Sequence, residues 1–207
     1  GAKVGAASER RQWLLRTLRP DCQPAFLRGN VPTRVSRLRE GKYDAIVLAE
    51  AGVHRLGLSF EGLHVARLRP SEWPNAAGQG ALAVQCRGDA AEVRARLAVL
   101  NDAATERAVT IERHWLGALG GGCSVPFGAA VWQAGAISHG GGGGVAGGPP
   151  PPPQDQEWHW AIGLAKDGAF RIRRGVGVTN GDEALRALLA GDPGEGWNAP
   201  IWESWHG

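Results

Sequence analysis

Apolar positions recur at helical spacing near the start of the chain. Leu14, Leu15 and Leu18 lie on one face of a predicted helix for which Ser8 is a candidate N-cap. The helix stops before Pro20, because proline disfavours helical backbone at the residue preceding it. The pattern therefore predicts one amphipathic helix with a defined start and end.

Two predicted strands flank a second helix. The first strand covers 25–27, and the helix runs from Pro32, which suits a first turn, to Gly41, which suits a C-terminal cap. The run AIVLA at 45–49 is continuously apolar, which is typical of a strand covered on both faces. Strands alternating with helices predict an α/β fold with a parallel sheet.

The pattern changes after residue 80. A strand is predicted at 81–86, followed by helices at 90–100 and 102–119. The second helix ends in three glycines directly before Cys123, so this cysteine is expected on a loop that other molecules can reach.

A tract of seven Gly and five Pro at 140–153 cannot pack a core. The segments 127–134 and 158–165 are expected to pair across it, which makes the tract an insertion within one domain. The alternative is a linker to a separate tail domain, although only about fifty residues follow.

A hairpin and a final helix are predicted near the end. Asp167-Gly168 is a hairpin signal between strands at 161–165 and 169–173. Asn180 and Glu183, three residues apart, resemble a capping box for a helix over 183–190.

Composition places the 207-residue chain in the globular class, with 43% hydrophobic and 21% charged residues. No apolar run approaches the ~18 residues that a membrane span requires, so no membrane partner is expected. Three cysteines without a C-x-x-C pair and six histidines without ligand spacing predict neither disulfides nor a metal site.

We expect a cytoplasmic location, or an organelle stroma if a transit segment was removed, and a monomer. The absence of Met and the first residue Gly1 predict a processed or truncated chain.

Positive charge is concentrated at one end. Residues 1–44 hold ten Lys and Arg against four Asp and Glu, although the net charge of the whole chain is only +3. Arginine forks suit bidentate recognition of carboxylates or phosphates. Ser8, Arg10 and Arg11 belong to a helix N-terminus, while Arg28 and Arg34 follow the next strand. Strand ends and helix starts line one edge of a parallel sheet, so these residues predict a polyanion cleft.

Three interpretations of these features compete. A reachable thiol beside an anion cleft suggests covalent attachment of a molecule that lies across the cleft. The cleft could instead hold a polycarboxylate without a covalent bond. Nucleic-acid binding through phosphates is the weakest alternative, because no aromatic-interleaved basic stripe accompanies the charge.

Several segments resemble the hydroxymethylbilane synthase, or porphobilinogen deaminase, family. They are VGAASERRQWLLRTLRPD, LRGNVPTRVSRLREGKYDAIVLAEAG with VHRLGL, AAGQGALAVQCR and ERHWLGALGGGCSVPFGAA, in the family's order over roughly residues 4–130. The resemblance implies a periplasmic-binding-protein-like parallel-sheet domain at 1–75, a crossover strand at 76–87 and a small α+β domain at 88–190. Residues 191–207 form a Trp-rich tail.

The resemblance also implies a chemistry. Cys123 is expected to carry a dipyrromethane cofactor through a thioether, and porphobilinogen units are added to it with loss of ammonia, giving linear hydroxymethylbilane for tetrapyrrole (heme and chlorophyll) synthesis. The residues that match carboxylate-binding positions of the family are Ser8, Arg10, Arg11, Arg28 and Arg34. Arg28 and Arg34 are also expected to act in catalysis. Porphobilinogen and the growing polypyrrole chain are then the partners, and nucleic acid is not.

The sequence departs from the family's pattern in two respects. Ala6-Ala7 replaces Thr-Ser, and Glu9 replaces an apolar residue, which should weaken substrate binding. The family's first domain, which supplies the proton-handling aspartate, has no counterpart before Gly1. We therefore expect the chain as given to be incomplete for the full transferase reaction. The strand expected at 81–86 would also lack its neighbours and expose an edge.

Overall fold

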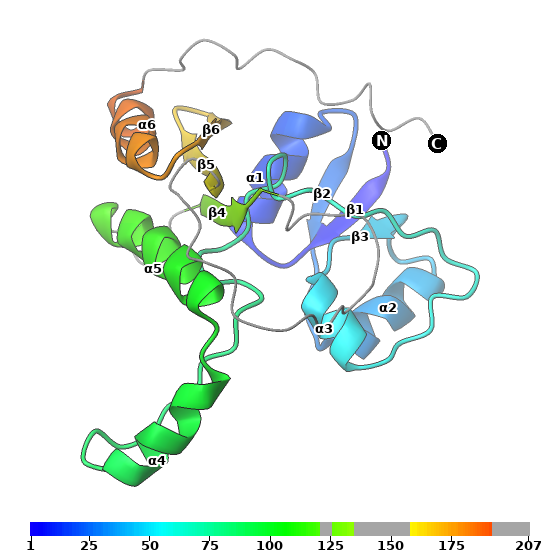
Figure 1. Ribbon diagram of the computed structural model, residues 1–207. Coiled ribbons are helices and arrows are strands. Elements are labelled where there is room, and N and C mark those ends of the chain that lie inside the picture. The colour runs from blue at the N-terminus through cyan, green and yellow to red at the C-terminus, as the bar shows by residue number, and fades with distance from the viewer. Residues whose placement is uncertain (121–125, 135–157, 192–207) are drawn as a thin grey trace.

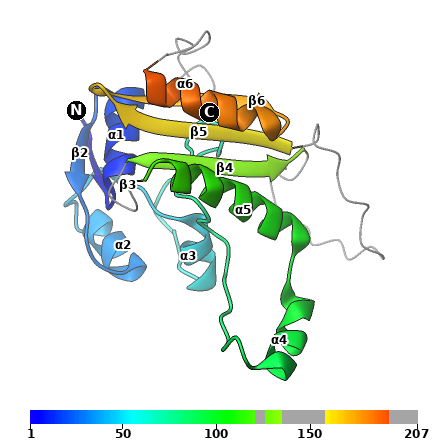
Figure 2. The same ribbon diagram turned by 90° about the vertical axis from the view of Figure 1, so that its left-hand side faces the viewer.

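The computed structural model describes residues 1–120, 126–134 and 158–191. Within these ranges the chain forms one parallel and one antiparallel sheet of three strands each, with helices packed on both. Figures 1 and 2 show the sheets and their helices together, with one helical arm projecting from them. The mixed α/β class predicted from the sequence is confirmed. None of the helices in the described ranges is long and apolar enough to span a membrane.

The parallel sheet comes from the start of the chain. β1 (Lys3–Ala6) lies between β2 (Gln23–Phe26) and β3 (Ala45–Ile46). Helix α1 (Glu9–Leu18) connects β1 to β2, and α2 (Val31–Arg39) connects β2 to β3. Each helix is thus the crossover that a parallel strand pair requires.

Helices α1 and α2 begin where the sequence predicts, but the strand predicted at 45–49 differs from the prediction. Ser8 is the N-cap of α1, and Pro32 lies in the first turn of α2. Only two residues of the run 45–49 pair as a strand, and none of the five is fully buried. The prediction of a strand covered on both faces is therefore wrong, because β3 lies at the edge of the sheet and α3 (Glu50–Arg55) begins directly after the run.

The sequence does not predict β1, although β1 is the central strand. Glycine is depleted in strands, so the segment KVGA has little β propensity. Gly5 is there for packing, since an added Cβ would lie 3.0–3.1 Å from side-chain atoms of Tyr43, Ile46 and Leu27.

The antiparallel sheet confirms pairing across the Gly/Pro tract. β4 (Phe127–Gln133) pairs with β5 (Trp158–Lys166), with Gln133 opposite Trp158. The tract is therefore an insertion between two paired strands, while 140–153 itself lies outside the described residues.

The predicted hairpin is also present. β5 turns into β6 (Ala169–Val176) through Asp167 and Gly168, whose φ angles are +51° and +81°. Two successive residues with positive φ are typical of the tight turn that matches the twist of a hairpin.

Three helices and a short 3-10 turn complete the described chain. They are α4 (Ala91–Leu97), the turn at Ala98–Leu100, α5 (Ala103–Ala118) and α6 (Thr179–Ala190). The capping box is a wrong prediction: Asn180 lies inside α6, and Val178 at the N-cap makes no side-chain bond. Gly177, with a φ angle of +80°, lets the chain leave β6 and enter the helix earlier than predicted.

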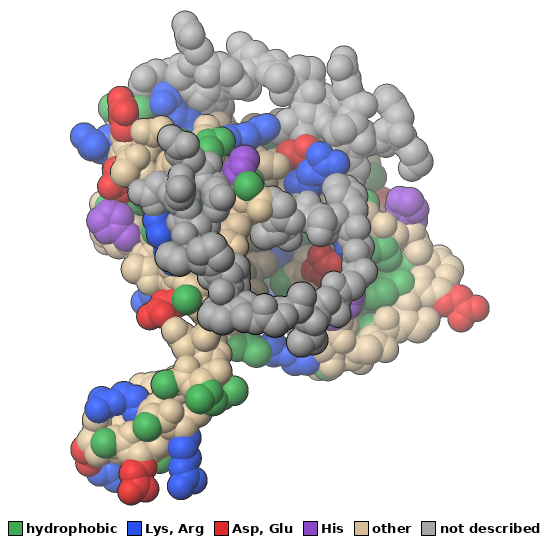
Figure 3. All heavy atoms as spheres, viewed as in Figure 1, with side chains coloured by type: hydrophobic (Ala, Val, Ile, Leu, Met, Phe, Trp, Pro, Cys, Tyr) green, Lys and Arg blue, Asp and Glu red, His purple; other side chains and the backbone are tan. Residues whose placement is uncertain are grey.

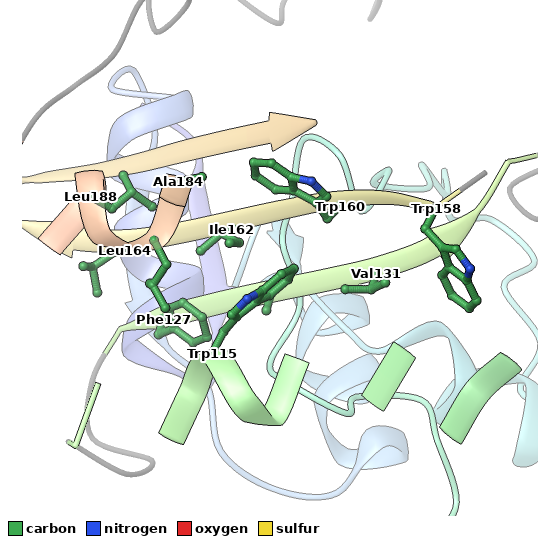
Figure 4. Close-up of a cluster of buried hydrophobic side chains, with 11 residues drawn as sticks. Trp115, Phe127, Val131, Trp158, Trp160, Ile162, Leu164, Ala184 and Leu188 are labelled. Carbon is green, nitrogen blue, oxygen red and sulfur yellow. The ribbon is translucent and has the colours of Figure 1, made fainter. Parts of the chain in front are cut away.

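Helices α5 and α6 cover one face of the antiparallel sheet. Figure 4 shows Trp115 of α5 and Leu188 of α6 pointing toward strand residues that include Phe127 and Ile162. A second core joins the two sheets, because Leu14 of α1 and Phe170 of β6 belong to the same buried cluster, together with Val4, Ala6, Leu15 and Trp73.

The segment after residue 80 forms an exposed arm. Residues 81–87 have no strand partner, and the side chains of Leu82 and Val84 are 76% and 64% exposed. The strand predicted at 81–86 is therefore absent, because none of the described strands pairs with these residues to bond their backbone N–H and C=O groups. Figure 3 shows apolar and charged side chains together on the arm that ends in α4. The predicted domain boundaries at 75, 87 and 190 stay predictions.

Candidate anion-binding site

The carboxyl ends of the parallel strands meet at one edge of the first sheet. Ser8 follows β1, Arg28 follows β2, and Val47 follows β3. Ligands of open α/β sheets bind at such edges, which is why the sequence predicts a polyanion cleft here. The structure places Ser8, Arg11, Arg28 and Arg34 at this edge, and it turns Arg10 in another direction.

Arg11 lies at the centre of the group and is only 8% exposed. Its guanidinium donates to the carbonyl of Val47 at 3.1 Å, and its backbone N–H donates to the Ser8 hydroxyl at 3.4 Å. Burial, and then the positive charge of Arg34, lower the pKa of Arg11. The Arg11 and Arg34 charges therefore lie near enough to repel each other.

The loop after β2 holds the other two arginines. Arg34 donates from Nε to the carbonyl of Gly29 at 2.7 Å and is half-buried. Arg28 is exposed, and its guanidinium lies 5.0 Å from the ring centroid of Phe26. Its carbonyl accepts from Arg37 at 3.0 Å. The backbone of this loop is thus held by arginine side chains.

Arg10 is 5% exposed and points to a different segment of the chain. Its guanidinium donates to the carbonyl of Pro74 at 2.6 Å and to the Gln79 side chain at 3.5 Å. Burial, and then the charge of Arg11, lower the pKa of Arg10 to about 10. Its cationic form therefore costs folding free energy at neutral pH, and this cost is relieved as the pH rises through about 10.

The arginines near the strand ends have no carboxylate ion-pair partner in the described ranges. Across the described ranges, no Asp or Glu forms an ion pair with Arg10, Arg11, Arg28 or Arg34. Buried cations without a counter-charge are unfavourable, and a bound carboxylate or phosphate would offset that cost. In the same part of the chain, no three His, Cys, Asp or Glu side chains gather in a way that could hold a metal ion.

The sequence did not point to the segment 73–80 or to Glu112, which together connect the two sheets. The carbonyl of Asn75 accepts from the backbone N–H of Ala129 at 2.8 Å. Glu112 accepts from Gly78 N at 2.7 Å and from Val131 N at 2.8 Å. A signal was present in the sequence, because Glu112 interrupts the apolar helical spacing of Ala108, Ile111, Trp115 and Leu119.

Cys123 lies outside the described residues. The described elements on either side of it are α5, which ends at Ala118, and β4, which begins at Phe127. Its predicted role as the attachment residue therefore stays a prediction.

Fold and site together define an α/β protein with three arginines, Arg11, Arg28 and Arg34 (the arginine cluster), at the carboxyl edge of a parallel sheet. Comparison with known proteins narrows this class. Residues 1–95 match the family model described as "Porphobilinogen deaminase, dipyromethane cofactor binding domain". The chain belongs to the porphobilinogen deaminase family.

Three curated relatives, all named porphobilinogen deaminase, illustrate the similarity. The protein from Stenotrophomonas maltophilia (strain R551-3) is 45% identical over 191 residues, which cover 92% of this chain and 56% of the relative. Those from Roseiflexus sp. (strain RS-1) and Xanthomonas campestris pv. campestris (strain B100) are 51% and 52% identical over 129 and 134 residues. These cover 62% and 64% of this chain, and 42% and 43% of the relatives. The chain thus spans about half the length of the relatives it matches.

Proposed function

We propose that this chain takes part in hydroxymethylbilane synthesis, in which four porphobilinogen units are joined with loss of ammonia. The observation that carries the proposal is the arginine cluster without carboxylate partners at the strand ends. Porphobilinogen bears an acetate and a propionate group, so each unit brings two anions that arginine forks can bind. Family membership supports this transferase activity.

A covalently held dipyrromethane on Cys123 is the cofactor we propose. Arg11 and Arg34 lie close enough for the charge of one to lower the pKa of the other, and within the described ranges neither forms an ion pair, which fits a cofactor with several carboxylates. When bound, dipyrromethane supplies the pyrrole carbon to which the next unit is joined. A thioether to Cys123 would hold that cofactor through all the additions.

The residues of this chain would bind and orient the carboxylates. Arg11 and Arg34 are fixed by backbone carbonyls of Val47 and Gly29, so their remaining N–H groups can meet a ligand in a set geometry. Arg28 is exposed and free to follow a chain that lengthens. Fixed positioning of reacting groups is a large contribution to catalysis, which repeated condensation needs at every step. Arg10 would add positive charge near the bound carboxylates without touching them, because its guanidinium already bonds to the segment 73–80.

We propose a periplasmic-binding-protein-like arrangement for the first domain, a monomeric state, and a cytoplasmic or organelle-stroma location. Porphobilinogen and the growing polypyrrole chain are the proposed partners. A non-catalytic polycarboxylate-binding module is the alternative, favoured by the fact that the arginine cluster is built from 1–50 alone.

Replacing the proposed attachment residue separates the two functions. Cys123→Ser is expected to abolish retention of pyrrole material after denaturing gel filtration, because only a covalent bond survives unfolding. Cys86→Ser, at a half-buried cysteine in the unpaired arm, serves as the matched control and should retain the material like the parent. Equal retention by Cys123→Ser and the parent would rule out covalent attachment at this residue.

A further inference from the structure

One buried carboxylate of α5 bonds to β4, and these are the two described elements on either side of Cys123. Glu112 lies on α5, six residues before that helix ends at Ala118. Its Oε1 accepts from Val131 N at 2.8 Å, on the strand that begins at Phe127. Helix α5 and strand β4 are therefore joined by one side chain.

The same carboxylate also reaches the arginine cluster through the segment 73–80. Its Oε2 accepts from Gly78 N at 2.7 Å, and four residues earlier the carbonyl of Pro74 accepts from Arg10 at 2.6 Å. Arg10 in turn is next to Arg11, whose charge lowers its pKa. A continuous set of bonded groups thus runs from the arginine cluster to α5 and β4.

The chemistry of the residue suits this role. β4 is an edge strand, so the N–H of Val131 has no neighbouring strand on that side, and Glu112 satisfies it. A carboxylate can accept from two backbone donors at once, whereas a glutamine amide would keep one oxygen and turn an N–H₂ toward the other donor. Glu112 is only 8% exposed and has no cationic partner in the described ranges, so its charge is expensive to bury.

We propose that Glu112 is a positioning residue that fixes the arginine cluster relative to α5 and β4, the described elements on either side of Cys123. This inference rests on the proposed function, because it assigns Glu112 the task of keeping the attachment point and the carboxylate-binding side chains in register. Such a residue touches neither substrate nor cofactor, and it acts through Gly78 and Val131.

Glu112→Gln tests the proposal, with Glu106→Gln as the matched control. Glu106 lies on the same helix and is exposed, and its carboxylate accepts from Asn101 at 2.6 Å instead of contacting 73–80. Each protein is examined by hydrogen exchange of peptides covering 73–80 and 127–133, and by the rate of covalent mass gain when the cofactor-free chain is incubated with porphobilinogen. Glu112→Asp, which retains the carboxylate, is the second variant should Glu112→Gln not fold.

We expect Glu112→Gln to speed exchange in both peptides roughly tenfold or more, because one backbone N–H loses its acceptor and the other bonds to a neutral amide oxygen in place of a carboxylate. Peptides from β1 and α1 should keep the parent's protection. The maximal rate of mass gain should fall while the half-saturating porphobilinogen concentration stays within about twofold of the parent, since the arginine cluster itself is intact. Glu106→Gln should match the parent in every measurement, and Glu112→Asp should fall between the parent and Glu112→Gln.

Unchanged exchange in both peptides would overturn the inference, as would mass gain at the parent's rate or an equal slowing in Glu106→Gln. If the parent itself gains no mass, the proposed function fails separately. Exchange and reversible porphobilinogen binding then decide the inference: binding should protect 127–133 in the parent and not in Glu112→Gln, and equal protection would refute it.

Discussion

Gly128→Ala is expected to lower the free energy of unfolding by about 2–3 kcal/mol. A Cβ at this position would lie 2.5 Å from the carbonyl oxygen of Pro74 and 3.0 Å from its carbonyl carbon. These are backbone atoms that cannot move alone, because Arg10 holds the Pro74 carbonyl and Ala129 bonds to Asn75. The substitution therefore pushes the segment 73–80 away from the second sheet. Urea unfolding followed by tryptophan fluorescence measures the loss.

Gly117→Ala provides the matched control for that substitution. Gly117 lies on the exposed face of α5, and a Cβ there would meet no atom within 4 Å. Alanine should raise the free energy of unfolding by about 0.5–1 kcal/mol, because it has the higher helix propensity. Equal stability of Gly128→Ala and the parent would show that the close approach of the two sheets is not required.

Arg11→Gln is expected to weaken porphobilinogen binding by roughly 10- to 100-fold, the effect of losing a charged bond to a carboxylate. The free energy of unfolding should not fall together with the porphobilinogen affinity. Removing a buried cation that has no ion pair in the described ranges relieves its desolvation cost, which offsets the loss of the bond to the Val47 carbonyl. Isothermal titration measures the affinity, and thermal unfolding without ligand measures the stability.

Arg16→Gln is the control on the same helix. Arg16 is exposed, donates to Gln12 at 3.4 Å and lies 5.8 Å from the Trp13 ring centroid, away from the strand ends. Its removal takes away the same formal charge and should change the affinity less than about twofold at physiological salt. Equal weakening by both variants would mean that net charge, and not the cluster, attracts the ligand.

Local signals predicted the elements that depend on local chemistry. Ser8 caps α1 and Asp167-Gly168 turns the hairpin, because cap and turn preferences act over a few residues. The pairing of β4 with β5 was also predictable, since both segments are strongly apolar and only the tract separates them.

Elements that depend on distant partners could not be predicted in this way. The run 45–49 has the composition of a buried strand, yet its place at a sheet edge leaves it half-exposed. The segment 81–87 has strand composition, but none of the described strands pairs with it. In both cases tertiary context overrides propensity.

In the candidate site, too, some side-chain positions follow from local rules and others depend on distant residues. The gathering of Ser8, Arg11, Arg28 and Arg34 follows from the rule that parallel strands present their carboxyl ends together. The inward turn of Arg10 depends on Pro74, which is 64 residues away, and no local pattern signals that contact.

We propose that this chain carries pyrrole material on Cys123 together with an arginine cluster that binds its carboxylates. The intact mass of the denatured chain purified from cells, followed by peptide mapping around Cys123, tests it most directly. We expect an added mass equal to two linked pyrrole units, located on the peptide that contains Cys123. An unmodified mass, or the same added mass on a peptide that contains Cys22 or Cys86, would contradict it.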